Sequence, residues 1–291
     1  METIGMIGLG AMGHSIARNI LDHGYSMVLY DVRPEAMEDL TGPRASAAAS
    51  LQDLGEKVDT VLVIVNTFPQ CRGVLEGLLE TMDRGVVINM STIAMDEAKA
   101  LEELALEKGV RMMDCPVSGG TAGAKQGTLT VMAAGEERLL ERYRPLFSSF
   151  AANIVHVGQR VGQGQAVKAI NQLLVGVHMC AAAEAFTLAR KCGLDLQMVY
   201  DTIRASAGSS RIFENRGQFL IDRDFSTRST LQIQLKDTDI ACRTANLVGA
   251  PTFLCGTARE LFKLSASKFP PTDDSIEVAR LYEELCGLGE Q

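Results

Sequence analysis

The sequence lacks the patterns that are typical of a metal site or a disulfide framework. Its cysteines are odd in number, seven, and include no Cys-x-x-Cys pair, whereas zinc sites and disulfide frameworks need closely spaced or paired residues. We therefore expect no metal, and we interpret the cysteines as reduced and mostly buried thiols. The four histidines show no ligand spacing either and are His14, His23, His156 and His178.

The sequence also lacks an excess of basic residues and a membrane-spanning run. Lys and Arg number 28 against 36 Asp and Glu, so the net charge is -8, which argues against binding to nucleic acid or anionic lipid. No basic segment opens the chain, and its longest apolar run, 173–188, falls short of a membrane span and contains His178 and Glu184. These absences predict a cytoplasmic protein that contacts neither nucleic acid nor membrane.

A glycine-rich turn follows the first predicted strand. Residues 4–8 form a short apolar run and residues 11–23 form a helix-like one. Where the two runs meet, residues 8–13 have the pattern Gly-x-Gly-x-x-Gly. The pattern alone is weak, but between a strand and a helix it predicts binding of a dinucleotide, whose phosphates rest on the helix N-terminus. The predicted cofactor-binding residues in this turn are Gly8, Leu9, Gly10, Ala11, Met12 and Gly13.

An acidic residue at the end of the second predicted strand bears on the choice of cofactor. Asp31 lies about 20 residues beyond Gly10, and a carboxylate at that point accepts hydrogen bonds from the adenosine ribose and repels a 2′-phosphate. This favours NAD. NADP stays open because Arg33 offers a partner for a phosphate, although it also fits a solvated loop charge.

The order of strand-like and helix-like segments predicts the fold class. In the first half, apolar runs alternate with helical patterns, which predicts a doubly wound parallel sheet of the Rossmann type. The 291 residues, 46% of them hydrophobic, suffice for two domains. We predict a dinucleotide-binding domain over 1–161, a long linking helix over 162–192 and an all-α domain over 193–291.

Polar residues follow the later predicted strands, where a doubly wound sheet binds its ligands. Asn66, Thr67 and Thr92 are predicted cofactor contacts, and the two threonines have an alternative as helix N-caps. The segment 114–124 is rich in small residues and is predicted to be a loop. Its backbone N–H groups and the Ser118 hydroxyl would hold a carboxylate, and the alternative is a flexible loop without a ligand.

The predicted linking helix opens with three polar residues. The spacing of Lys168, Asn171 and Gln172 places their side chains on one side of the helix. Polar groups at the start of a buried helix need partners, which the rest of the chain should supply. We also predict that an apolar stripe of this helix is buried, formed by Val167, Ile170, Leu174, Val177, Ala181, Ala185 and Leu188.

Taken together, these motifs resemble the β-hydroxyacid dehydrogenase family, which includes 3-hydroxyisobutyrate, tartronate semialdehyde and threonate enzymes. The resemblance runs along nearly the whole chain. It is carried by Gly8 to Gly13, Asp114-Cys115-Pro116-Val117-Ser118-Gly119-Gly120, Gly162-x-Gly164-x-x-x-Lys168-x-x-Asn171 and Lys236-Asp237. Val65-Asn66 and Asn171-Gln172 look most like the threonate dehydrogenase branch.

The resemblance implies a role for each of these residues. Lys168 is the catalytic residue, Asn171 assists it, and Lys236 lies at the cofactor cleft. The substrate carboxylate is bound by Ser118, Gly119 and Gly120. Many relatives have Asn-Asn where this chain has Asn171-Gln172, and their second amide contacts the substrate. The resemblance therefore implies that Gln172 is a substrate-binding residue, in a variant substrate pocket.

The implied reaction is the NAD-dependent oxidation of a small 3-hydroxy acid or acid sugar, with Lys168 as general acid and base. A lysine has a pKa near about 10.4 in water, so this role requires burial or a nearby charge such as Lys236 to lower the pKa. The alternatives are an NADPH-dependent reductase of tartronate or succinate semialdehyde and a non-catalytic dinucleotide-binding module. Apolar surface on the amphipathic helices further predicts a homodimer or homotetramer.

Overall fold

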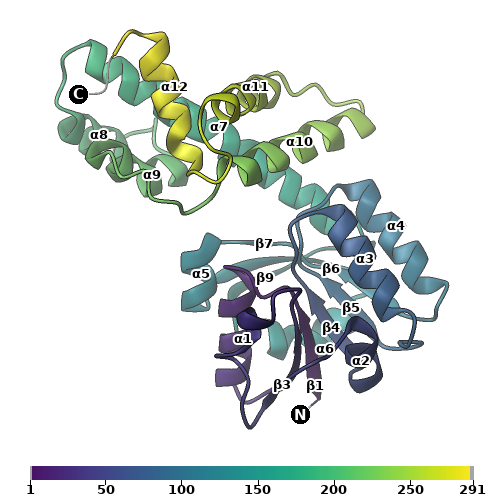
Figure 1. The fold of residues 1–291 in the computed structure, drawn as a ribbon. Helices are drawn as coiled ribbons and strands as arrows, with labels where there is room; N and C mark the ends of the chain where they lie inside the picture. The colour runs from purple at the N-terminus through teal and green to yellow at the C-terminus, as the bar shows by residue number, and fades with distance from the viewer. Residues whose placement is uncertain (1, 289–291) are drawn as a thin grey trace. The chain divides into compact units, whose positions relative to one another are not determined.

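The computed structural model describes residues 2–288 and divides the chain into two compact units, with the boundary between Lys168 and Ala169. The first unit is a sheet flanked by helices and the second consists of helices (Figure 1). One long helix, α7 (Gln163–Lys191), contributes residues to both units. The predicted fold class is confirmed.

The first unit is built on a 9-stranded sheet. Its strands are β1 (Thr3–Ile7), β2 (Ser26–Tyr30), β3 (Ala45–Ala47), β4 (Thr60–Val63), β5 (Val86–Asn89), β6 (Arg111–Asp114), β7 (Val117–Ser118), β8 (Leu129–Ala134) and β9 (Ala151–Gly158). They lie in the order β3-β2-β1-β4-β5-β6-β8-β7, with β9 paired to β8. The order reverses between β1 and β4, and doubly wound sheets bind ligands at the carboxyl ends of strands at such a reversal.

Helices cover both faces of the sheet. They are α1 (Gly13–Asp22), α2 (Leu51–Lys57), α3 (Phe68–Leu78), α4 (Met95–Leu106), α5 (Gly120–Gln126) and α6 (Glu137–Phe147), with a short 3₁₀ helix η1 (Pro34–Met37). Because side chains alternate along a strand, Leu29 and Ile88 join one core with α1, α5 and α6, while Val28 and Val87 join a second core with α2, α3 and α4. The strand-end loops therefore project from a scaffold that is packed on both sides.

Some elements of this unit differ from those predicted. The segment 114–124, expected to be a loop, contains β7 and the start of α5, because Gly119 (φ 133°) and Gly120 (φ 65°) take backbone conformations that favour glycine and turn the chain into a helix. The sheet is not parallel throughout, since β8 runs antiparallel to β6 and β7. The sequence-based prediction also omitted β3, α2 and α6.

The second unit packs the remainder of α7 among shorter helices. These are α8 (Leu196–Arg204), α9 (Arg211–Asp222), α10 (Leu231–Leu247), α11 (Phe253–Lys268), η2 (Ser275–Glu277) and α12 (Val278–Leu285). Its core includes the stacked rings of Phe186 and Phe213, whose centroids are 5.3 Å apart. The buried Asp274 carboxylate accepts hydrogen bonds from the backbone of Arg228, Ser229 and Ile276, which ties the start of α10 to η2.

The buried face of α7 is not the predicted one. Ile170, Leu174 and Leu188 of the predicted stripe are 61%, 48% and 63% exposed. The buried face instead carries small residues such as Gly176, which lies so close to α10 that a Cβ there would sit 2.7 Å from Thr238 Cγ2. By length and composition α7 could cross a membrane, but 50% of its most apolar window is buried, as in a core helix.

Candidate functional site

The glycine-rich turn joins β1 to α1, and two of its glycines are required by the backbone. Gly8 has φ 89°, and a Cβ there would lie 2.1 Å from the Ile64 carbonyl oxygen. A Cβ on Gly13 would lie 1.9 Å from the Gly8 carbonyl oxygen. A Cβ on Gly10, by contrast, would meet nothing within 4 Å. The turn therefore leaves open space at Gly10, where a pyrophosphate can approach the backbone and the free N–H groups of the first helical turn.

Asp31 supports this turn from the carboxyl end of β2. Its Oδ2 accepts a hydrogen bond from Leu9 N at 2.7 Å, and its Oδ1 accepts from Arg33 N at 2.9 Å. Burial acts to raise the pKa of Asp31, but the backbone N–H groups of Arg33 and Leu9 and the Arg33 guanidinium outweigh it, so the pKa is lowered. A charged carboxylate therefore lies beside the turn, as a ribose-binding site requires.

The loops after β4 and β5 are held next to each other. Thr67 is the N-cap of α3, and the Gln70 side chain accepts hydrogen bonds from Asn66 N and Thr67 N. Ser91 Oγ accepts a hydrogen bond from Val65 N at 2.9 Å and so joins the two loops. The N-cap of α4 is Ala94, so the alternative interpretation of Thr92 as an N-cap is wrong.

The predicted carboxylate-binding segment lies between β7 and α5. Ser118 is paired with Thr130 of β8 and is partly exposed, while Gly119 and Gly120 are exposed. Gly119 is the N-cap of α5, and a Cβ on Gly120 would meet nothing within 4 Å. The backbone here is thus open to a ligand on the side where α5 begins.

A buried hydrogen-bond cluster fixes the start of α7. Asp114 Oδ2 accepts from Gly162 N and Gln165 N, both at 2.9 Å, and its Oδ1 accepts from Gln165 Nε2 at 2.7 Å. Gln165 also donates to Ser91 O and accepts from Ile93 N, so it links the loop after β5 to the helix. Burial above all raises the pKa of Asp114 to about 6.

This cluster positions the candidate catalytic lysine. Lys168 lies three residues beyond Gln165 on α7 and is 7% exposed. Sequence reasoning gave no role to Gln165 or Asp114. The one available signal was a carboxylate in the second motif and a Gln directly after Gly164 in the third, but their partnership spans 51 residues, and no local pattern predicts it.

Three predicted site residues lie in the second unit. On α7, Asn171 Nδ2 donates to Gln172 Oε1 at 2.8 Å. Gln172 Nε2 in turn donates to Asp237 Oδ2 at 2.5 Å, and Lys236 Nζ lies 3.3 Å from Asp237 Oδ1. The structure thus joins Asn171, Gln172 and Lys236 through the carboxylate of Asp237, to which the sequence assigned no role of its own.

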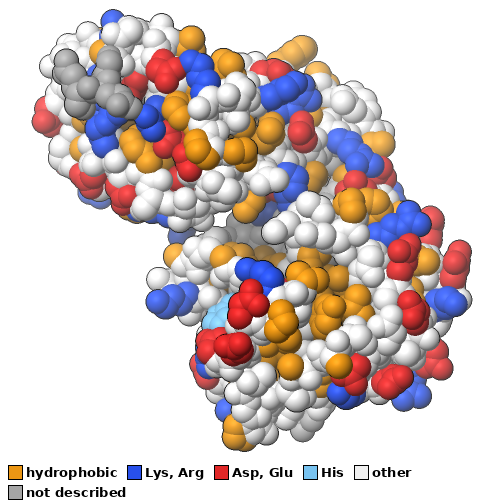
Figure 2. Space-filling model, viewed as in Figure 1, with side chains coloured by type: hydrophobic (Ala, Val, Ile, Leu, Met, Phe, Trp, Pro, Cys, Tyr) orange, Lys and Arg blue, Asp and Glu red, His pale blue; other side chains and the backbone are white. Residues whose placement is uncertain are grey.

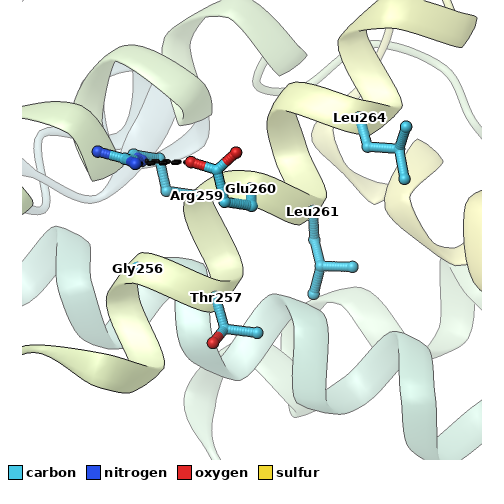
Figure 3. Close-up of a pocket in the computed structure, with 6 residues that line it drawn as sticks. All are labelled: Gly256, Thr257, Arg259, Glu260, Leu261 and Leu264. Atoms are coloured by element: carbon cyan, nitrogen blue, oxygen red, sulfur yellow. Dashed lines mark hydrogen bonds and ion pairs between the residues drawn. The ribbon is translucent and has the colours of Figure 1, made fainter.

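A shallow hollow in the second unit contains none of the predicted site residues. The hollow lies beside α11 (Figure 3) and includes the ion pair of Arg259 with Glu260 at 2.6 Å. On the face shown in Figure 2, acidic and basic side chains are interspersed over both units. Within residues 2–288, no group of three or more His, Cys, Asp or Glu side chains is arranged to hold a metal ion. The hollow is lined by Gly256, Thr257, Arg259, Glu260, Leu261 and Leu264.

Comparisons with known families match both halves of the chain. Residues 3–158 match the NAD binding domain of 6-phosphogluconate dehydrogenase. Residues 162–282 match the family described as NAD-binding of NADP-dependent 3-hydroxyisobutyrate dehydrogenase. Together the two matches cover nearly the whole chain.

Individual relatives are similar over nearly their full length. An L-threonate dehydrogenase of Haemophilus influenzae is 34% identical, with 95% of this chain and 94% of that protein covered. An NAD-dependent L-serine dehydrogenase of Pseudomonas aeruginosa is also 34% identical, with 99% and 100% covered. The crystal structure of 3-hydroxyisobutyrate dehydrogenase from Salmonella typhimurium has a TM-score of 0.88 and 35% identity, and covers 97% of this chain and 100% of that chain.

Proposed function

The chain belongs to the β-hydroxyacid dehydrogenase family of NAD(P)-dependent oxidoreductases, and from this premise we propose that it oxidises the hydroxyl of a small acid sugar such as threonate, with NAD. The observation that carries the proposal is the anchored position of Lys168, a buried lysine one turn beyond the Asp114–Gln165 cluster. Threonate is favoured by the named relatives and by the Asn171-Gln172 pair.

In the proposed complex, the cofactor occupies the glycine-rich turn. Gly10 gives the pyrophosphate access to the backbone, and Asp31 accepts hydrogen bonds from the adenosine ribose. Further contacts come from the loops after β4 and β5. The proposed cofactor-binding residues are Gly8, Leu9, Gly10, Ala11, Met12, Gly13, Asp31, Asn66, Thr67, Thr92 and Lys236.

The substrate is held by its carboxylate and its hydroxyl. Ser118 and the backbone of Gly119 and Gly120 bind the carboxylate, while Asn171, which donates to Gln172, hydrogen-bonds a second hydroxyl that Lys168 does not deprotonate. Lys168 Nζ takes the proton from the hydroxyl as the carbinol C–H bond breaks, and in the reverse direction it returns that proton to the alkoxide. The bound nicotinamide supplies the hydride acceptor at C4.

The proposed function is tested by a substrate screen. C3 to C5 hydroxy acids, including threonate, 3-hydroxyisobutyrate and serine, are each incubated with NAD, and the absorbance of the reduced nicotinamide is followed. We expect turnover with at least one acid that carries a 3-hydroxyl. Absence of turnover with every such acid, while semialdehydes are reduced by NADPH, would replace the proposal with the reductase alternative.

Replacing Asp31 tests the choice of cofactor. We expect Asp31→Ala to raise KM for NAD by about 10- to 100-fold and to reduce the preference for NAD over NADP. If the variant only loses the hydrogen bond to Leu9, the binding of NAD and of NADP should weaken alike. If it also loses the repulsion of the 2′-phosphate, the binding of NADP alone should improve. The measurement is therefore the ratio of kcat/KM for NAD to kcat/KM for NADP. Glu35→Ala is the control, since it removes an exposed carboxylate nearby. An unchanged ratio contradicts the assignment.

We also propose that the protein is a cytoplasmic homo-oligomer. The support for association is the exposed apolar face of α7, which includes Ile170, Leu174 and Leu188. All seven cysteines are free thiols, which suits a reducing compartment. Light scattering should give a molar mass of two or four times that of the chain, and Leu174→Glu should lower it. A wild-type protein that stays monomeric contradicts the first part.

A further inference from the structure

A chain of hydrogen bonds in the second unit has a fixed direction. It runs from Asn171 Nδ2 to Gln172 Oε1, and from Gln172 Nε2 to Asp237 Oδ2. Gln172 is 8% exposed and Asp237 is 4% exposed, so both are largely withheld from water. Lys236 Nζ, 3.3 Å from Asp237 Oδ1, gives the buried carboxylate a cationic partner.

The direction follows from the chemistry of the last member. A carboxylate accepts hydrogen bonds and has none to donate, so the Gln172 amide must turn its NH₂ group toward Asp237. Its oxygen then points to Asn171, which must answer with its own NH₂ group. Asn171 Oδ1 is consequently the end of the amide that remains for an external partner. Either amide alone could turn over, but the carboxylate fixes both.

We propose that Asp237 is a positioning residue that acts through Gln172 to make Asn171 a hydrogen-bond acceptor for a hydroxyl of the bound hydroxy acid other than the one that Lys168 deprotonates. The inference rests on the proposed function and adds a determinant of its selectivity. A hydroxyl donates to Asn171 Oδ1, whereas a substrate with an ether or a carbonyl at that position offers no hydrogen and leaves the amide unsatisfied. Gln172 transmits the orientation and does not itself need to touch the substrate.

A direct test exchanges the amide and the carboxylate between positions 172 and 237. In Asp237→Asn the amide introduced there can donate or accept, so the direction is lost, and kcat/KM for the hydroxy acid should fall by about 10- to 100-fold. In Gln172→Glu two carboxylates face each other, and activity should fall at least as far. The double variant D237N/Q172E moves the carboxylate to α7, where it accepts from Asn171 and from the amide introduced on α10, and this restores the direction.

Recovery in the double variant separates orientation from simple structural support. We expect its kcat/KM to return to within about fivefold of wild type, a coupling that independent effects would not give. Asp239→Asn, an exposed carboxylate on the same helix, is the matched control. Should Asp237→Asn fail to fold, Gln172→Leu, which leaves Asp237 and Lys236 in place, should show the same loss of kcat/KM.

Two results would overturn the proposal. One is wild-type kcat/KM in a folded Asp237→Asn or Gln172→Leu variant. The other is a double variant that is folded and no more active than the weaker single variant. Both are distinct from failure of the proposed function, because in that case the wild-type protein itself oxidises none of the hydroxy acids.

Discussion

Lys168→Ala should retain its fold and its affinity for NAD but lose about 10²- to 10⁴-fold in kcat, the range that a positioned general acid or base contributes. The reason is that the Asp114–Gln165 cluster fixes the start of α7, and so the position of Lys168 one turn further along, where its amine takes up the proton of the substrate hydroxyl. Steady-state rates at saturating NAD, with hydroxy acid varied, measure the effect. Small primary amines added to the assay should restore part of the rate, since they replace the missing amine.

The control for this experiment lies on the same helix. Lys191 is exposed in the last turn of α7, and Lys191→Ala should leave kcat within about twofold of wild type, as expected for a surface change. If Lys168→Ala kept near wild-type turnover, the proton transfer would have to be assigned to another group.

Asp114→Asn should destabilise the protein by about 2 to 4 kcal/mol and also reduce turnover. The carboxylate accepts hydrogen bonds from Gly162 N, Gln165 N and Gln165 Nε2, and an NH₂ group in place of either oxygen faces a donor. Gln165 cannot turn its amide over to compensate, because it is also fixed by Ser91 O and Ile93 N. Chemical denaturation gives the stability, and kcat reports the displacement of Lys168.

The same group predicts a pH dependence of stability. The folded protein raises the pKa of Asp114 from 3.8 to about 6, so the folded state holds this proton more tightly than the unfolded state. The resulting stabilisation is complete below the unfolded pKa and is lost as the pH rises through about 6. The difference in Tm between wild type and Asp114→Asn should therefore be larger at about pH 4.5 than at about pH 7. Asp83→Asn, which changes an exposed carboxylate, is the control, and its difference in Tm from wild type should be the same at both pH values. A difference independent of pH contradicts the assignment.

The parts of the fold that sequence predicted are those with local signals. The glycine-rich turn lies between a strand and a helix as expected. These elements are marked by residues close together in the chain, such as glycines at a turn or apolar side chains at helical spacing. The short β3 and the helix α5 have weak signals of this kind and were missed or taken for loop.

The exposed stripe of α7 shows why hydropathy alone gave the wrong buried face for this helix. Ile170 and Leu174 are the more apolar side chains, yet Gly176 and Ala183 face the core. Close approach of α10 leaves no room for a side chain at Gly176, so the packing distance decides which face is buried. The spacing of apolar residues in the sequence does not indicate how closely α10 approaches α7.

The residues of the candidate site stay a prediction from the sequence, whereas their connections are seen only in the structure. Each motif was recognisable by itself, whereas the links between them join residues far apart, such as Gln172 with Asp237, separated by 65 positions. Asp237 was visible in the sequence beside Lys236, but nothing local indicates which amide it binds. Orientation within the site is a property of the folded chain.

The division of the chain falls inside a helix, and this has a consequence for how the protein is handled experimentally. Lys168 is the last residue of one unit and Asn171 lies just inside the other, yet both belong to one uninterrupted α7. Their separation of about 4.5 Å along the axis is therefore set by the rise of an α-helix. A truncation between the units would break α7 between Lys168 and Asn171 and lose this fixed spacing. Fragments of the protein should therefore each contain the whole of α7 if they are to keep the spacing of its polar groups.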